Sequence, residues 1–277
     1  MLDTVIFSLI KGLPFSIKKK LIEDHKSPKK AIVNLKISLR EVNSKTGLKI
    51  LNQINSNAIV EKAEKIIQEC MENKIQIIPY WDNFYPKDLI HCIDAPFLIY
   101  SKGEQNPNTQ SLISIVGTRN CTDYGLKEIK RILNYLKPYP IGIVSGLAYG
   151  IDIYAHKTAN ELNLVNHAVL GGGINRIYPK KHLEDSQKIK ENGILISEYS
   201  PNEGPRAYHF PRRNRIIAGM SKCTIVIESK KTGGAMITAR LANDYNRDVF
   251  AVPGNNNQVC SSGSNLLIQR HQATILN

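Results

Sequence analysis

From Ser111 onward, short aliphatic runs alternate with stretches long enough to form helices, and this alternation constrains the fold more than any other feature. Strands are predicted over residues 112–116, 141–145, 166–170, 194–197, 223–228 and 249–252, and helices over 124–136, 151–162, 182–191 and 235–245. Short β-branched strands separated by helices of this length form parallel sheets that are covered on both faces. The sequence therefore predicts the α/β class, with a doubly wound and mostly parallel sheet.

The chain up to residue 75 has a different pattern, which is typical of helices, most clearly over residues 61–71. The turn at Gly12 is compatible with a helix-hairpin-helix or SAM-like unit, and Thr46-Gly47-Leu48 with a second such turn. An ordinary small helical bundle is the alternative. We therefore expect a small helical domain over residues 1–75 and a larger α/β domain over residues 76–277.

Glycine-bearing segments follow several predicted strands, and ligands of such sheets bind beyond the carboxyl ends of the strands. The segments are Gly117-Thr118-Arg119, Ser145-Gly146, Gly171-Gly172-Gly173 and Gly233-Gly234. Because glycine lets the backbone approach a ligand, the amides of Thr118 and Arg119 are expected to face an anion. Farther along the chain, Lys180 can neutralise a phosphate and Tyr178 can stack on a base, with a packed turn at Tyr178-Pro179 as the alternative.

Residues 209–219 place three arginines and an asparagine at the start of a predicted helix. Guanidinium groups beside exposed helix-start amides favour phosphate. A solvated basic helix face is the alternative, and the glycine-bearing strand ends weigh against it. In the helix after the second strand, Asp152 is expected to cap the first turn and His156 to be structural.

The formal net charge of +13 suggests a polyanionic partner. Five scattered cysteines without a Cys-x-x-Cys pair indicate reduced thiols in a cytoplasmic protein rather than disulfides or a zinc site. No apolar run is long enough to span a bilayer, so no membrane partner is expected. The sequence also lacks both the Gly-x-Gly-x-x-Gly and the P-loop patterns, so no nucleotide cofactor is expected. It shows no cluster of metal ligands, so no metal is expected.

Taken together, these segments resemble the DNA-processing protein A family, also called DprA or Smf. The matching segments, in order, are Tyr85-Pro86-Lys87-Asp88-Leu89, Asp94-Ala95-Pro96, Ile115-Val116-Gly117-Thr118-Arg119, Val144-Ser145-Gly146-Leu147-Ala148, Gly150-Ile151-Asp152, Tyr178-Pro179, Ser197-Glu198-Tyr199, residues 210–217, Ile237-Thr238-Ala239-Arg240, residues 249–254 and Asn265-Leu266-Leu267-Ile268. They span residues 80–270.

The resemblance implies an extended Rossmann-like fold that binds single-stranded DNA in natural transformation, without a cofactor and without catalysis. Such a protein protects incoming strands, helps to load the RecA recombinase and acts as a dimer. By position, the phosphate pocket would comprise Gly117, Thr118, Arg119, Ser145, Gly146, Lys180, Arg213, Asn214 and Arg215, with Gly233 and Gly234 at its rim. Leu266, Leu267 and Ile268 correspond to the region of self-association and RecA contact. Many members continue into a winged-helix-like domain, which is not expected in a chain that ends at Asn277.

Two enzymes are the rival interpretations. A nucleotide N-glycosidase of the lysine-decarboxylase-like type would need Pro-Gly-Gly-x-Gly-Thr-x-x-Glu, but Thr232 precedes Gly233-Gly234 and no glutamate follows. A nicotinamide-dependent dehydrogenase is disfavoured by the missing Gly-x-Gly-x-x-Gly. If the chain binds DNA, Arg119→Ala and Arg215→Ala should each weaken binding uniformly across sequences and lower the salt slope by about one.

Overall fold

The computed structural model describes residues 1–41 and 44–277 and begins with five helices. These are α1 (Leu2–Leu9), α2 (Phe15–His25), α3 (Pro28–Glu41), α4 (Lys45–Asn55) and α5 (Asn57–Glu72). The turn between α1 and α2 places Gly12 at a φ of 88°, a conformation that favours glycine. The second predicted turn, at Thr46-Gly47-Leu48, is wrong. Those residues form the first turn of α4, because the Ser44 hydroxyl accepts a hydrogen bond from the Gly47 amide and caps the helix.

The remainder of the chain is an α/β unit. Its strands are β1 (Gln76–Pro79), β2 (Leu98–Gly103), β3 (Ser111–Val116), β4 (Ile141–Ser145), β5 (Val165–Val169), β6 (Gly193–Ser197), β7 (Cys223–Val226), β8 (Asp248–Ala251) and β9 (Thr274–Ile275). Its helices are α6 (Asp123–Leu136), α7 (Ile151–Glu161), α8 (Leu183–Glu191), α9 (His209–Gly219), α10 (Gly234–Asp244) and α11 (Ser262–Gln269). Short 3-10 helices lie at Leu89–His91, Lys180–His182 and Val259–Ser261.

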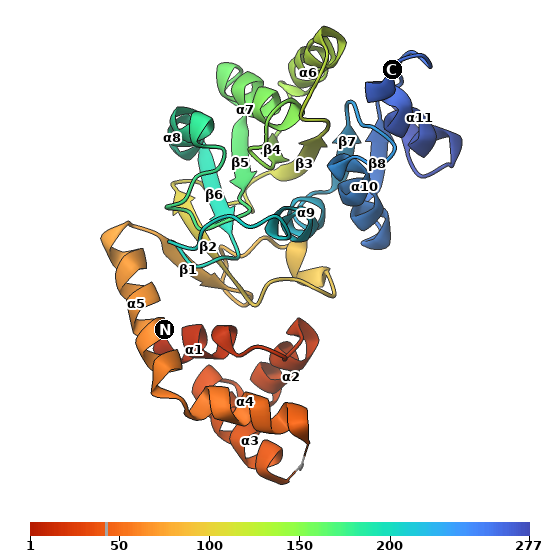
Figure 1. The fold of residues 1–277 in the computed structure, drawn as a ribbon. Helices are drawn as coiled ribbons and strands as arrows, with labels where there is room; N and C mark the ends of the chain where they lie inside the picture. The colour runs from red at the N-terminus through yellow and green to blue at the C-terminus, as the bar shows by residue number, and fades with distance from the viewer. Residues whose placement is uncertain (42–43) are drawn as a thin grey trace.

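All nine described strands form one sheet in the order β1-β2-β6-β5-β4-β3-β7-β8-β9. Pairing is parallel from β6 to β9, whereas β1 and β2 form an antiparallel pair that joins β6 antiparallel. Helices α6, α7 and α8 cover one face, and α9 and α10 pack together on the other (Figure 1). The predicted α/β class and doubly wound sheet, preceded by helices, are confirmed.

The strand order reverses at β3. The chain moves from β3 outward to β6 and then returns to place β7 on the opposite side of β3. In open α/β sheets, the carboxyl ends of the strands diverge at such a switch point and leave a crevice where ligands bind. The fold therefore predicts a ligand site between the segments that follow β3 and β7.

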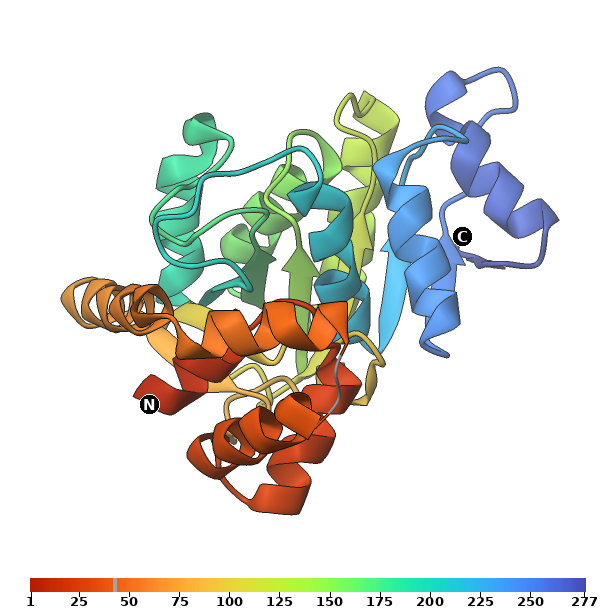
Figure 2. The same ribbon diagram turned by 60° about the horizontal axis from the view of Figure 1, so that its bottom comes forward.

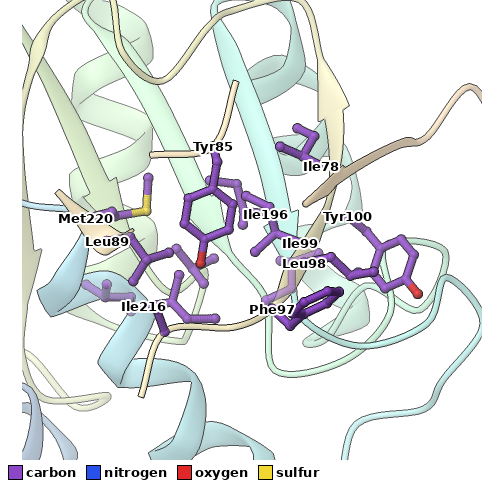
Figure 3. Packing of buried hydrophobic residues seen from close by; sticks show 14 of the residues in the cluster. Ile78, Tyr85, Leu89, Phe97, Leu98, Ile99, Tyr100, Ile196, Ile216 and Met220 are labelled. Carbon is purple, nitrogen blue, oxygen red and sulfur yellow. The ribbon is translucent and has the colours of Figure 1, made fainter. Parts of the chain in front are cut away.

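The helical start packs against the antiparallel end of the sheet (Figure 2). Buried side chains of α1, α5, β1 and β2 belong to one apolar cluster. Figure 3 shows this cluster near β2 and β6, where Tyr85 packs beside Leu89, Ile216 and Met220. The Tyr85 hydroxyl donates a hydrogen bond of 2.6 Å to the Pro96 carbonyl, which satisfies the one polar group of that buried ring.

Within residues 1–41 and 44–277, no helix has both the length and the apolar character that crossing a membrane requires.

Candidate nucleic-acid interface

A cleft of about 750 Å³ lies at the switch point, between the segments that follow β3 and β7. Residues 116–120 form one wall, and Lys230, Gly233 and Gly234 form the opposite wall. Helix α9 supplies the floor through Phe210, Arg213, Asn214 and Ile217. The structure therefore brings together seven of the predicted site residues: Gly117, Thr118, Arg119, Arg213, Asn214, Gly233 and Gly234.

Two faces of helix α9 have different surroundings, one toward the cleft and one toward Glu198. Phe210, Arg213, Asn214 and Ile217 recur at spacings of three and four residues, so they share the face toward the cleft. Arg215 is about half a turn away from Arg213 and faces the opposite side. There its guanidinium pairs with Glu198, and both side chains are less than one-tenth exposed. The assignment of Arg215 to the pocket is wrong, because helical geometry separates it from Arg213.

Arg213 is a buried cation under the cleft. Its Nη1 donates hydrogen bonds to the carbonyls of Gly146, at 2.6 Å, and of Val169, which end β4 and β5. Burial lowers the pKa of Arg213 to about 10, while nearby Asp152 acts to raise it and Arg119 to lower it. Arg213 is charged at neutral pH, and its hydrogen bonds hold the strand ends in place. Because the side chain is buried, it adds positive electrostatic potential to the cleft rather than a direct contact with a ligand.

The carboxyl group of a buried aspartate lies at the end of β4. Asp152 is buried, and burial raises the pKa of its carboxyl group. Arg213 and hydrogen bonds from the amides of Ala148 and Gly146 act against that shift. The amides after β4 are thus directed at an internal carboxylate. Asp152 does not cap α7, whose N-cap is Gly150 without a side-chain bond, so that expectation is wrong.

Glu228, at the end of β7, positions the loop that carries Arg119. Its carboxylate accepts hydrogen bonds from the Thr122 hydroxyl, at 2.6 Å, and the Thr122 amide, at 2.9 Å. Its backbone carbonyl accepts from the Thr118 amide at 2.7 Å. The expectation that the Thr118 amide faces an anion is therefore wrong. A single buried acid at a strand end has no sequence signal, so sequence reasoning missed Glu228.

Aromatic and cationic side chains gather at the mouth of the cleft. The Phe210 ring lies 5.5 Å from the Tyr178 ring and 5.9 Å from the Arg119 guanidinium carbon. Exposed Arg119, Arg206 and Lys230 accompany buried Arg213, and Asp152 is the one acid among the described lining residues. Arg206, which sequence reasoning did not single out, lies on the loop before α9. This combination of stacking surfaces and positive charge suits a flexible polyanion that carries bases.

Four predicted site residues do not line the cleft: Ser145, Gly146, Lys180 and Arg215. The buried Ser145 hydroxyl donates a hydrogen bond of 2.6 Å to the Ile115 carbonyl. Gly146 has a packing role, because a Cβ there would lie 2.2 Å from the Arg213 guanidinium. Lys180 is exposed on a 3-10 helix outside the cleft. These positions lie beside or beneath the cleft rather than in it.

His156 is buried within α7, as its expected structural role requires. Its Nδ1 donates to the Asn166 side-chain oxygen at 2.6 Å, since an amide oxygen can only accept. Burial lowers the pKa of His156 to about 4. Its Nε2 meets no hydrogen-bond partner among the residues that the structure describes, which favours the neutral ring.

The predicted self-association segment is only partly available at the surface. Leu267 is 3% exposed and belongs to the core, whereas Leu266 and Ile268 are half-buried. Leu267 is therefore not available for self-association in this conformation, because α11 packs that side chain against the rest of the sheet unit. Across the described residues, no group of three or more His, Cys, Asp or Glu side chains is arranged to hold a metal ion.

Comparison with known proteins gives the fold and site a family context. The model of the family described as DNA recombination-mediator protein A matches residues 76–277. The chain belongs to this family. Among curated members, the DNA processing protein DprA of Streptococcus pneumoniae is 36% identical over 218 residues, which cover 78% of this chain and 77% of that protein.

Solved structures of the family share the architecture. The X-ray structure of DNA processing protein A from Streptococcus pneumoniae has a TM-score of 0.86 and 30% identity, and covers 100% of this chain and 94% of that one. The same protein from Helicobacter pylori, whose structure concerns its unique single-stranded DNA binding mode, has a TM-score of 0.66 and 28% identity. That comparison covers 73% of this chain and 90% of the other.

Proposed function

We propose that this member of the DNA recombination-mediator protein A family binds single-stranded DNA in the cleft between β3 and β7, without catalysis and without regard to base sequence. The observation that supports this most directly is the charge of the lining: Arg119, Arg206, Arg213 and Lys230 face one buried acid, Asp152. The comparison with the Helicobacter pylori protein, which concerns single-stranded DNA binding, agrees with this assignment.

The geometry favours a single strand over a duplex. Arg119 and Lys230 approach from opposite walls of a cleft of about 750 Å³. A flexible strand can lower its phosphates between such walls, whereas a stiff duplex presents them on a broad cylinder. Tyr178 and Phe210 offer faces on which any base can stack, so base identity is not read.

The test is a fluorescence-polarisation titration of the full chain with labelled oligothymidine, mixed-sequence single strands and duplex of equal length. We expect similar affinities for the two single strands, weaker duplex binding, and a loss of affinity between about 0.05 and 0.2 M salt. Binding that prefers duplex, or that does not respond to salt, would contradict the proposal.

By membership of the family, we extend the proposal to natural transformation in the cytoplasm. There the chain would shield incoming strands from nucleases and help the RecA recombinase to assemble on them. A nuclease-protection assay and RecA-dependent ATP hydrolysis on strands coated with single-strand-binding protein test the two roles separately. No protection and no stimulation would restrict the function to DNA binding.

Self-association through α11 belongs to the same proposal. Leu266 and Ile268 are half-buried there, and Ile275 of the neighbouring edge strand β9 is 47% exposed. Light scattering of Ile268→Asp should show a smaller particle than the wild-type chain, and an unchanged mass would count against a dimer through this helix.

A further inference from the structure

A second and larger groove, of about 1330 Å³, lies between the helical start and the α/β unit. One wall comes from the α1–α2 turn and α5, and the other from the second face of α9 with the loop before it. The proposed DNA cleft on the opposite face of α9 leaves this groove without a role. We propose that a single strand leaving the cleft continues into this groove, which extends the proposed binding site.

The groove and the cleft are continuous. Arg206, Pro211 and Ile237 line both, so the N-terminal end of α9 and the first turn of α10 form the junction between them. Arg206 is exposed at that junction. A strand whose phosphates lie at Arg119 in the cleft can therefore pass the cation Arg206 on its way into the groove.

The far wall of the groove carries exposed lysines. Lys62 and Lys65 are three residues apart on α5, so they project from one side of the helix. Lys11 belongs to the α1–α2 turn, whose backbone is fixed by two hydrogen bonds to the Gln53 side chain, at 3.0 and 3.3 Å. None of the ion pairs found in the described residues involves these three lysines.

Four acids line the described part of the groove, and one of them, Glu198, is paired with arginine. Glu198 is paired with Arg215 and lies 3.4 Å from Arg212, and Glu203 lies 3.7 Å from His209. Asp94 accepts a hydrogen bond of 2.5 Å from the Tyr245 hydroxyl. Glu69, on α5, is half-buried and has no partner among the ion pairs of the described residues. Across the described lining, seven basic side chains (Lys11, Lys18, Lys62, Lys65, Arg206, Arg212 and Arg215) outnumber the four acids, so the groove attracts phosphates.

This inference rests on the proposed function and predicts a dependence on strand length. Lys62→Ala/Lys65→Ala should bind oligothymidine of about 20 nucleotides roughly tenfold more weakly than the wild type, with a salt slope smaller by about 1.4, since each single-strand phosphate contact contributes about 0.7. Oligothymidine of about six nucleotides fills only the cleft, so its affinity should be unchanged.

The matched control is Lys29→Ala/Lys30→Ala, which removes two exposed lysines of α3 that do not line the groove. It should bind both lengths as the wild type does. Long-strand affinity of Lys62→Ala/Lys65→Ala within twofold of this control would overturn the inference, as would an equal loss for both lengths. Arg119→Ala tests the cleft independently, because it should weaken the binding of both lengths. If the wild type itself binds neither length, the proposed function fails, and the inference fails with it.

Discussion

Arg119 is an exposed arginine of the cleft, its guanidinium lies over the Phe210 ring, and it has no carboxylate partner among the described ion pairs. Arg119→Ala should weaken single-strand binding equally for all sequences and lower the salt slope by about 0.7, which refines the value of about one expected from the sequence, since each phosphate contact on a single strand contributes about 0.7. Titration at several salt concentrations measures both quantities. Arg131→Ala, on the exposed side of α6, is the control, and a wild-type slope in Arg119→Ala would contradict the prediction.

Arg215 behaves differently even though it is two residues from Arg213. Its removal leaves Glu198 buried without its closest cation, so Arg215→Ala should lower the free energy of unfolding by about 3 kcal/mol. The folded fraction should retain the wild-type salt slope for oligonucleotides of about six nucleotides. Urea unfolding and polarisation titration separate the two effects, and a lower slope with unchanged stability would return Arg215 to the phosphate site.

At the scale of elements, Gly146 shows why the end of β4 carries glycine. A Cβ there would lie between 2.2 and 2.5 Å from the Arg213 guanidinium, whose hydrogen bonds to the ends of β4 and β5 leave it little room to move. Gly146→Ala should therefore cost about 1–3 kcal/mol of stability through overpacking. Thermal unfolding is the measurement. Gly234→Ala, where a Cβ meets nothing within 4 Å, should leave stability nearly unchanged.

His156 in α7 gives the fold a dependence on pH. Burial lowers its pKa from 6.5 to about 4, so the unfolded chain binds a proton at higher pH than the folded chain does. The contribution of about 3 kcal/mol is complete above pH 6.5 and is lost as the pH falls toward 4. His167, whose pKa burial lowers to about 3, acts in the same direction.

Substitution of His156 isolates that contribution. His156→Gln can still donate to Asn166 but does not titrate, so unfolding free energies measured in urea should fall less steeply below pH 6.5 than in the wild type. A slope identical to that of the wild type between pH 6.5 and 5 would show that His156 does not couple to folding.

The sequence predicted the elements of the α/β unit closely, and it predicted the cleft only in outline. The strand expected over residues 112–116 is β3 at Ser111–Val116, because aliphatic runs between glycine and polar segments have few alternatives. Glycine-bearing ends predicted the cleft edge at Gly117. By contrast, Arg215 was misplaced because it was assigned by its position in the family pattern. The predicted helix already implied that residues two apart, such as Arg213 and Arg215, face different sides. The burial of Leu267 was not predicted because a short amphipathic helix does not reveal which of its faces is covered.

At the scale of the whole molecule, an aromatic cluster joins the helical start to the sheet. The Phe97 ring lies 5.3 Å from Phe7 of α1, 5.8 Å from Tyr80 and 5.5 Å from Trp81. The buried Lys18 ammonium of α2 lies 5.6 Å from the same ring, and burial lowers its pKa to about 8. Since both parts share one apolar core, they are expected to unfold together.

Phe97→Ala removes the shared contact and should cost about 3–5 kcal/mol, most of it at the junction. Trp81 is the one tryptophan of the chain, and its 43% exposure makes its fluorescence a local probe of that junction. In the wild type, Trp81 fluorescence and far-ultraviolet circular dichroism should report one unfolding midpoint in urea. In Phe97→Ala, the fluorescence midpoint should precede the dichroism midpoint, whereas Phe84→Ala, at an exposed ring, should keep them coincident. Coincident midpoints in Phe97→Ala would mean that other contacts suffice to couple the two parts, and the groove between them would then keep its walls without this ring.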